Sequence, residues 1–276
     1  MKNLVSTHWL KSNIDNENLV IVDCRFDLQT PSYGRDSYNK GHIKGAFYMD
    51  MNEDLAGEVK DHGGRHPLPD LNEFKEKIEN MGIGNDTIVV AYDDGEIAGA
   101  SRFWWILKYL GHEKVYILNG GIKKWIERNY PLTKDIPNKN KKEFKINLNE
   151  EIIAYMLEVK ERKDEESVAI LDSRSNERYK GEVEPIDKVA GHIPGAKNYF
   201  WMEVLENDEL KENEKLKNHF KDLEKYKEVI VHCGSGITGC VNFLALDEIG
   251  IKSKLYLGSW SDWISYDENE IAIGEK

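Results

Sequence analysis

The feature that most constrains the fold is an internal repeat. Four segments of the first half recur in the same order in the second half, about 140–150 residues later. The matched pairs are LVIVDCR (19–25) with VAILDSR (168–174), GHIKGA (41–46) with GHIPGA (191–196), TIVVAYDD (87–94) with EVIVHCGS (228–235), and YILNGGIKKW (116–125) with LYLGSWSDW (255–263). So long a period indicates a duplicated domain rather than a solenoid, and 276 residues are enough for two domains.

Within each half, short β-branched runs alternate with helical patterns. LVIVD (19–23) and VAILD (168–172) are typical of buried strands, whereas residues 101–112 and 236–251 favour helices. The sequence therefore predicts an α/β fold of two tandem domains, each a mainly parallel sheet with helices on both faces. We expect an N-terminal domain at 1–130, an exposed Lys- and Asn-rich linker at 131–147, and a C-terminal domain at 148–276.

Composition excludes several classes of protein. A net charge of −12 argues against nucleic-acid binding, because an acidic chain repels phosphate backbones. No apolar run approaches the ~18 residues of a membrane span, so no membrane partner is expected. The three cysteines are few and odd in number, which fits a reducing compartment and predicts a cytoplasmic protein. Their spacing, and that of the histidines, suggests no zinc site, and we expect neither metal nor organic cofactor.

Cys233 is the candidate nucleophile. It follows the apolar run EVIV and begins CGSGIT, a glycine-rich loop before a helix. Gly234 and Gly236 let the backbone curl so that the N–H groups of 234–238, including Ile237 and Thr238, point at the sulfur. These dipoles should lower the pKa of the thiol and could hold a second sulfur as an anionic persulfide. The other two cysteines, Cys24 and Cys240, lack such a loop and are expected to be structural.

The same loop argues against a phosphatase. Because it contains no arginine or lysine, a cation for an anionic substrate must come from elsewhere in the chain. A phosphatase loop would place arginine six residues after the cysteine, where this chain has Gly239. Positive charge is available instead at the end of the strand VAILD. Arg178 is the candidate clamp for an anionic substrate, because arginine grips carboxylates and sulfonate-like groups. Asp172 and Arg174 are expected to form a structural pair that supports the loop.

The first half has an aspartate, Asp93, where the second has Cys233. A carboxylate cannot carry sulfane sulfur and would repel an anionic substrate. We therefore expect the N-terminal domain to be catalytically inactive.

Taken together, these motifs resemble the tandem-domain rhodanese-type sulfurtransferases, the thiosulfate and 3-mercaptopyruvate sulfurtransferase family. VSTHWL (5–10), the two GH-I-x-GA motifs, NGGIKKW, LGSWSDW and CGSGIT carry the resemblance, which spans nearly the whole chain. It implies two α/β domains, a single active cysteine in the C-terminal domain and a persulfide intermediate.

The resemblance also suggests a substrate. CGSGIT carries no cation, which resembles 3-mercaptopyruvate enzymes rather than thiosulfate enzymes. In the former, the loop serine works with a histidine and an aspartate from the N-terminal domain. Ser235 fits the serine, and His66 fits the histidine, with His62 as a nearby rival. The aspartate position falls on Asn52, two residues after Asp50. A second substrate arginine is absent near EPIDK, where Lys188 is the nearest cation.

These observations predict a sulfurtransferase that moves sulfane sulfur from a small anionic donor to a thiol, a thioredoxin-like protein or cyanide. The preferred donor is 3-mercaptopyruvate, with thiosulfate as the alternative. A more remote alternative is a non-catalytic sulfur carrier or redox sensor that uses Cys233 without turnover. His42 and His192 should bond locally, and Trp260 and Trp263 should line the core or a cleft wall.

Overall fold

The computed structural model describes residues 2–275, which divide by their internal contacts into two compact units. The first unit runs to Gly57 and includes Leu68–Asn149 and Glu206–Leu210. The second consists of Glu58–Pro67, Glu150–Leu205 and the residues from Lys211 onward. Each unit is therefore built largely from one half of the sequence, but the ten-residue stretch Glu58–Pro67 belongs with the second unit.

The stretch expected to be a linker, 131–147, groups with the first unit. Most of its side chains are exposed, but Phe144 is buried beside His112, with ring centroids 5.8 Å apart. One buried aromatic residue thus anchors a polar segment that has no regular secondary structure of its own.

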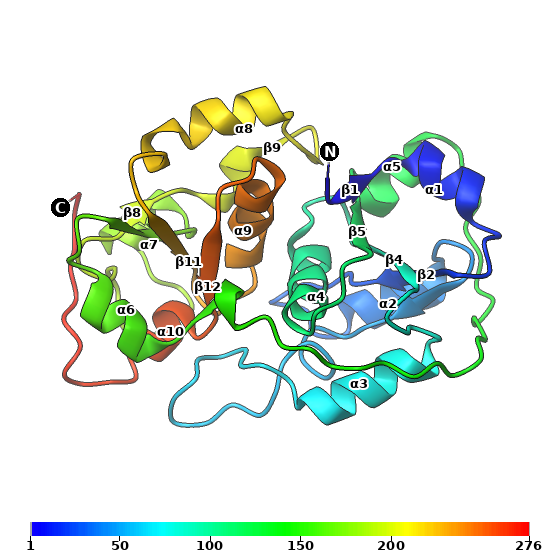
Figure 1. Ribbon diagram of the computed structural model, residues 1–276, viewed down its shortest axis with the longest axis horizontal. Coiled ribbons are helices and arrows are strands. Elements are labelled where there is room, and N and C mark those ends of the chain that lie inside the picture. Colours follow the sequence, from blue (N-terminus) through cyan, green and yellow to red (C-terminus); the bar gives the residue numbers. More distant parts are fainter. Residues whose placement is uncertain (1, 276) are drawn as a thin grey trace. The chain divides into compact units, whose positions relative to one another are not determined.

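The first unit contains a five-stranded parallel sheet of order β1-β5-β4-β2-β3 (Figure 1). Its elements are β1 (Leu4–Val5), α1 (Thr7–Asn13), β2 (Leu19–Asp23), α2 (Tyr33–Lys40), β3 (Ala46–Tyr48), α3 (Leu71–Asn80), β4 (Ile88–Tyr92), α4 (Ala98–Tyr109), β5 (Val115–Leu118) and α5 (Gly121–Glu127). A short two-stranded sheet pairs β9 (Leu205–Glu206) with β10 (Glu209–Leu210).

The second unit repeats this topology in the order β6-β12-β11-β7-β8. Its elements are η1 (Glu150–Ile152), β6 (Ile153–Ala154), α6 (Met156–Arg162), β7 (Val168–Asp172), α7 (Asn176–Lys180), β8 (Lys197–Asn198), η2 (Trp201–Val204), α8 (Asn213–His219), η3 (Lys221–Leu223), β11 (Glu228–His232), α9 (Gly239–Glu248), β12 (Ser253–Tyr256) and α10 (Ser259–Trp263). The repeat and the parallel α/β fold predicted from the sequence are confirmed.

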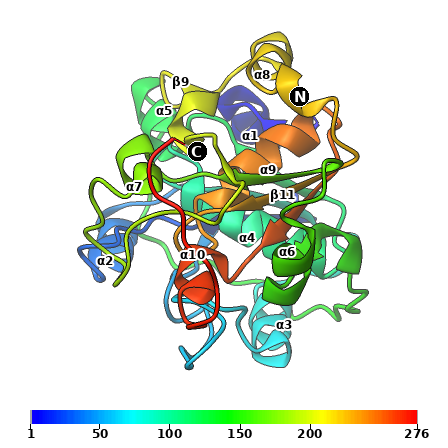
Figure 2. The ribbon, with the colours of Figure 1, turned by 90° about the vertical axis from the view of Figure 1, so that its left-hand side faces the viewer.

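Alternating residues of the central strands cover the two faces of this second sheet. Val168 and Ile170 of β7 pack in one cluster with Trp260 and Trp263 of α10, and α6 adds to the same cluster. Helices α6 and α10 face the viewer in Figure 2. Helix α9, apolar around most of its circumference, packs against β11 and β12. The sheet is thereby buried on both sides, and its functional groups gather at the strand ends.

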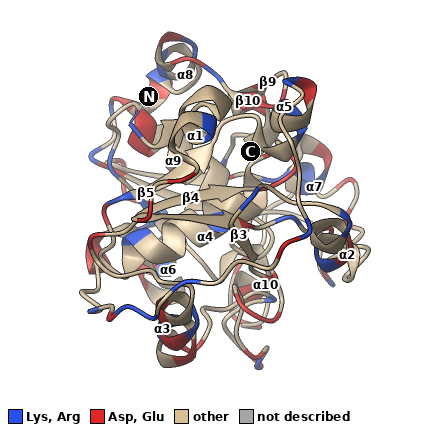
Figure 3. Cartoon of the chain, turned by 90° about the vertical axis from the view of Figure 1, so that its right-hand side faces the viewer, with Lys and Arg blue, Asp and Glu red and all other residues tan. Residues whose placement is uncertain are grey.

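Lys and Arg residues (blue) and Asp and Glu residues (red) are interspersed along the helices and loops of the cartoon in Figure 3. Among residues 2–275, no helix combines the length and the apolarity that crossing a membrane would require.

Candidate active site

Three strand ends of the second unit meet at the candidate site. Strand β11 ends at His232, one residue before Cys233, and lies between β7 and β12. His232 is in register with Asp172, the last residue of β7. Strand β12 ends at Tyr256, three residues before Ser259. Because all these strands are parallel, their carboxyl ends bring Cys233, the β7–α7 loop and the β12–α10 turn to one edge of the sheet.

The loop after β11 wraps around the sulfur of Cys233, which is 1% exposed. The backbone N–H of Gly236 donates to Sγ at 3.1 Å. Gly236 has φ +79°, a left-handed conformation that glycine adopts without strain. Burial raises the pKa of the Cys233 thiol. The Thr238 hydroxyl and the N–H groups of Ser235, Gly239 and Gly236 outweigh that effect and lower the pKa below its ordinary value.

This arrangement predicts that Cys233 becomes a thiolate at unusually low pH. The thiolate population rises as pH rises through the pKa, so a lowered pKa moves that rise below the ~8.5 of an ordinary cysteine. Thiolate absorbance, taken as the difference between the wild type and Cys233→Ser, should show this midpoint. Thr238→Val, which removes only the hydroxyl, should move the midpoint upward.

Cys24 supplies the internal control for this titration. It is equally buried, but burial and nearby aspartates, Asp23 first, raise the pKa of its thiol well above the usual value. It should therefore remain protonated across the range in which Cys233 ionises. A Cys233 midpoint at or above that of a free cysteine would contradict the role assigned to the loop.

The turn between β12 and α10 fixes the base of the loop. The Ser259 Oγ accepts the backbone N–H of Cys233 at 3.1 Å and lies 3.9 Å from Sγ. Ser259 has φ +59°, a left-handed conformation that costs a residue other than glycine on the order of 1–3 kcal/mol. The matching residue of the first unit is Gly121, with φ +55°. The second unit thus keeps a strained serine where the first has glycine, and its hydroxyl holds the nucleophile's backbone.

A polar pair lies beside the cysteine loop. His66 Nδ1 and Ser235 Oγ are 2.8 Å apart, and both side chains are buried. His66 comes from the Glu58–Pro67 stretch, which is bound to α10 through two further contacts. Asp262 accepts the N–H of Gly63 at 2.7 Å, and Ser261 accepts the N–H of Arg65 at 3.1 Å. The structure therefore brings together two of the predicted site residues, which lie 169 positions apart in the chain.

The other residues considered as partners of the loop serine bond to residues near them rather than to the cysteine loop. His62 bonds Ser265 Oγ at 2.8 Å and stacks on Tyr266, so it anchors the stretch rather than the loop. In the first unit, the Asp50 carboxylate accepts the Asn52 N–H at 2.9 Å and the Tyr48 hydroxyl at 3.1 Å. Asn52 itself is exposed.

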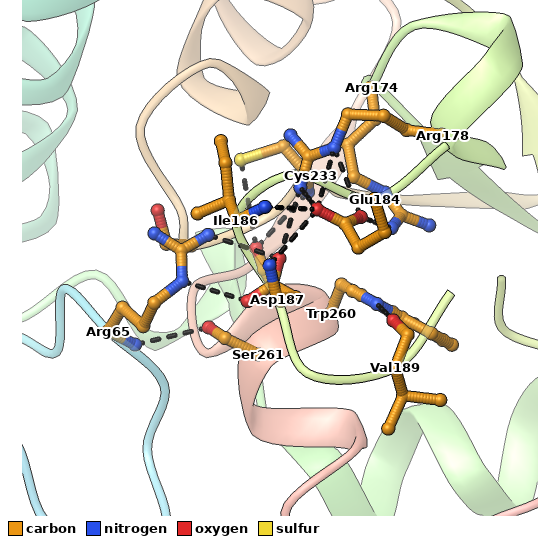
Figure 4. Close-up of polar contacts among 12 residues, drawn as sticks. Arg65, Arg174, Arg178, Glu184, Ile186, Asp187, Val189, Cys233, Trp260 and Ser261 are labelled. Carbon is orange, nitrogen blue, oxygen red and sulfur yellow. Dashed lines mark hydrogen bonds and ion pairs between the residues drawn. The ribbon is translucent and has the colours of Figure 1, made fainter. Parts of the chain in front are cut away.

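Arg178 lies in an ionic cluster rather than alone. Its guanidinium donates to Glu184 at 2.7 Å and to Asp187 at 3.0 Å (Figure 4). A methyl group built on Gly234 would lie 3.4 Å from Nη2 of Arg178, so the guanidinium covers the residue directly after Cys233. The predicted clamp therefore lies against the cysteine loop, with two carboxylates holding it there.

Arg174 is buried and bonds only to other parts of the protein, so its role is structural. It bonds Asp172 at 2.6 Å and the carbonyl of Gly191 at 2.7 Å, and its side chain is 1% exposed. The same pair occurs in the first unit, where Arg25 bonds Asp23 at 2.6 Å. A pair present in both units, with and without the cysteine, supports the loop in each.

Sequence reasoning missed Arg65. A methyl group on Gly234 would lie 3.1 Å from its Nη2, closer than to any atom of Arg178. The repeat could not reveal it, because the Glu58–Pro67 stretch has no counterpart among the matched segments. Lys188, the cation expected in its place, is exposed and lines the same cavity as Arg65, with a volume of about 560 Å³.

The first unit forms a similar loop around an aspartate. The Asp93 carboxylate accepts four backbone N–H groups, from Gly95 at 3.0 Å, Ile97 at 2.9 Å, Gly99 at 3.0 Å and Ala100 at 3.2 Å. Burial raises the pKa of Asp93 to about 6, against the lowering effect of these bonds. The loop is occupied by the protein's own carboxylate.

The GHI histidines and the α10 tryptophans have local roles. His42 bonds the Tyr38 carbonyl at 2.9 Å, and His192 bonds the Tyr179 carbonyl at 2.8 Å. Trp260 and Trp263 are fully buried. Within residues 2–275, no cluster of three His, Cys, Asp or Glu side chains could hold a metal ion.

A duplicated parallel α/β unit, with a cysteine in an amide-lined loop of the second copy, defines the class of protein. The rhodanese-like domain model matches residues 6–128 and 156–266, and the chain belongs to that family. The predicted resemblance is confirmed.

Among its relatives, a Pseudomonas aeruginosa protein named "Probable 3-mercaptopyruvate sulfurtransferase" is 37% identical over 99% of this chain and 98% of its own. A thiosulfate sulfurtransferase of Rattus norvegicus is 30% identical over 99% of this chain and 95% of its own. The crystal structure of SseA from Escherichia coli, described as a 3-mercaptopyruvate sulfotransferase, superposes with a TM-score of 0.82 at 32% identity, covering 95% of this chain and 100% of that one.

Proposed function

We propose that the protein is a sulfurtransferase that takes sulfur from 3-mercaptopyruvate onto Cys233 and passes it to a thiol, a thioredoxin-like protein or cyanide. One observation carries the choice of donor: the buried contact of 2.8 Å between His66 and Ser235 beside the cysteine loop. Full-length relatives named as sulfurtransferases support the enzyme class. The sparse, buried thiols support a cytoplasmic location.

The proposed first half-reaction begins with the thiolate of Cys233. The Cys233 thiolate attacks the donor sulfur, and the carbon–sulfur bond breaks with its electron pair going to carbon. The products are a persulfide on Cys233 and the enolate of pyruvate, which takes a proton to become pyruvate. The N–H groups of the loop, Gly236 foremost, stabilise the persulfide anion as they stabilise the thiolate.

In this proposal, Ser235 and His66 supply that proton. With a proton on Nδ1, His66 donates to Ser235 Oγ, and the hydroxyl hydrogen of Ser235 is then free to point toward the enolate carbon. Arg178 holds the donor carboxylate through its guanidinium. In the second half-reaction, the acceptor attacks the outer sulfur and the Cys233 thiolate returns, which gives ping-pong kinetics.

Thiosulfate provides the contrast that tests this role. When Cys233 attacks its outer sulfur, sulfite leaves with the electron pair and needs no proton. We expect Ser235→Ala and His66→Gln each to lower kcat/KM for 3-mercaptopyruvate by roughly 100-fold or more, as loss of general acid catalysis does, and to change kcat/KM for thiosulfate far less. Steady-state kinetics with both donors, at matched acceptor and pH, measures this.

His62→Gln is the matched control, because His62 lies in the same stretch and contacts Ser265 instead of the loop. It should leave the ratio of the two donors unchanged. Equal losses with both donors in the Ser235 and His66 variants would reject the proton-transfer role. A wild type that prefers thiosulfate would reject the donor, and absence of turnover with either would favour a sulfur carrier.

A further inference from the structure

We infer that His232 is a positioning residue for the nucleophile: its imidazole, neutral and protonated on Nδ1, holds the carbonyl of Cys233 and keeps the cysteine loop in the shape that favours the thiolate. The inference rests on the proposed role of Cys233 as the sulfur carrier, and it adds a residue outside the loop to that role. Because it concerns the ionisation of the thiol, it can be tested without any sulfur donor.

His232 contacts the backbone of the nucleophile directly. It is the last residue of β11, and its side chain is 0% exposed. Its Nδ1 lies 3.1 Å from the carbonyl oxygen of Cys233. A carbonyl oxygen can only accept a hydrogen bond, so Nδ1 must carry the proton in this contact. The geometry therefore selects one of the two neutral tautomers of the ring.

The second ring nitrogen of His232 is not engaged in this way. Nε2 lies 3.8 Å from Oδ2 of Asp172, beyond hydrogen-bond distance, and within residues 2–275 it finds no hydrogen-bond partner. A buried polar atom without a partner costs stability, so its presence calls for a physical reason. The reason inferred here is the other nitrogen, which holds the backbone of the nucleophile.

The surroundings of the ring keep it neutral. Burial lowers the pKa of the His232 imidazole. Asp172 acts in the opposite direction, but Arg174 and His192 add to the lowering. The remaining neighbour is Tyr256 of β12, whose ring centroid lies 6.4 Å away. At neutral pH the imidazole is therefore uncharged and can donate through one nitrogen only.

The first unit has a tyrosine at the matching position. Tyr92 ends β4 in register with Asp23, as His232 ends β11 in register with Asp172. The Tyr92 hydroxyl donates to Asp23 Oδ2 at 2.7 Å. Tyrosine therefore supports the aspartate of the neighbouring strand, whereas histidine is too short to do so and bonds the carbonyl of the next residue. This change coincides with the change from aspartate to cysteine at that next residue.

The carbonyl of Cys233 is held by two donors. Besides the imidazole, it accepts the backbone N–H of Trp260 at 3.0 Å. Because a peptide group is planar, fixing this carbonyl also fixes the N–H of Gly234 and hence the start of the loop. N–H groups further along the loop lower the pKa of the Cys233 thiol, and this effect depends on their distance and direction. Loss of one of the two donors should therefore raise that pKa.

His232→Leu and His232→Asn form the test pair. Leucine removes the donor, whereas Nδ2–H of asparagine can take the place of Nδ1–H of histidine. We expect leucine to raise the midpoint of the Cys233 titration by about one unit, which leaves about tenfold less thiolate at neutral pH, and to lower kcat/KM for both donors in proportion. Asparagine should keep most of the wild-type values. Thiolate absorbance, taken as the difference between each protein and its Cys233→Ser counterpart, gives the midpoints.

The melting temperatures of the two variants separate positioning from a structural role. A purely structural histidine would lower the melting temperature in both variants and leave the thiol midpoint at the wild-type value. That result would overturn the inference, and so would an asparagine variant that titrates like the leucine variant.

Tyr92→Phe is the matched control in the first unit. It removes the buried hydroxyl that bonds Asp23, so it should lower the melting temperature. The Cys233 midpoint should stay at the wild-type value. A shifted midpoint would mean that the titration follows overall stability, and it would count against the inference.

Nitrogen-15 spectra of the imidazole rings report the tautomer directly. The His232 signals, assigned by their loss in His232→Asn, should show a proton on Nδ1 and none on Nε2 at neutral pH. The opposite tautomer or a charged ring would refute the positioning role even if sulfur transfer is found. The expected tautomer and titration would stand even if the enzyme preferred another donor or acted only as a sulfur carrier.

Discussion

Cys233→Ser is expected to abolish sulfur transfer from both 3-mercaptopyruvate and thiosulfate. A hydroxyl at this position stays protonated near neutral pH and cannot carry sulfane sulfur, whereas the loop lowers the pKa of the Cys233 thiol. Turnover with each donor measures the loss. Mass spectrometry of the wild type after donor treatment should show one added sulfur, located on the peptide that contains Cys233.

The other two cysteines are the controls for this experiment. Cys240, on α9, donates its S–H to the Gly236 carbonyl at 3.3 Å, and Cys24 has a pKa raised by burial. Cys24→Ser and Cys240→Ser should both retain activity. A stable persulfide on Cys240, or residual turnover in Cys233→Ser, would move the nucleophile away from the loop.

Arg174→Met is expected to lower the free energy of unfolding by about 3–5 kcal/mol, the usual cost of leaving one member of a buried ion pair without its partner. Burial alone would raise the pKa of Asp172, but Arg174 outweighs it and holds that pKa below its usual range. The variant leaves the Asp172 carboxylate, which is 0% exposed, in place without its guanidinium partner. Chemical denaturation followed by tryptophan fluorescence measures the change, because Trp260 lies 4.7 Å from the Arg174 guanidinium.

Arg178→Gln separates this structural effect from substrate binding. Arg178 is partly exposed, and its carboxylate partner Glu184 keeps the backbone N–H groups of Ile186 and Asp187. Arg178→Gln should therefore lose less stability than Arg174→Met while losing donor affinity. If Arg174→Met left stability unchanged and affected only donor KM, the assignments of the two arginines would have to be exchanged.

The sequence was sufficient for the fold because the information is repeated. VAILD and EVIVH are apolar, β-branched and bounded by polar loops, so β7 and β11 could be placed, and parallel order then brought Arg178 to the edge that holds Cys233. Gly234 and Gly236 of the cysteine loop could likewise be recognised from the local sequence alone. These are short-range signals, and each half of the chain provides them independently.

Arg65 and Ser259 could not be placed in this way, for different reasons. Arg65 lies in a polar stretch without regular secondary structure, and its position depends on contacts with α10 and Asp187, which no local pattern encodes. Ser259 gave no sign of a left-handed backbone because it is not glycine. Its alignment with Gly121 in NGGIKKW was the available signal, since that motif begins a turn in both units.

The aspartate in the loop of the first unit has a consequence for amide hydrogen exchange. Asp93 keeps four backbone N–H groups occupied whether or not a substrate is present. In the second unit, the N–H of Gly236 donates to the sulfur of Cys233. In each proposed catalytic cycle this side chain changes from a thiolate to a longer persulfide and back again. Amides 95–100 should therefore exchange at one rate throughout turnover, whereas amides 235–239 should slow when sulfur is loaded and quicken when it leaves. The loop around Asp93 can therefore serve as an internal reference for hydrogen exchange. Its rates give the baseline against which changes in the loop around Cys233 are measured.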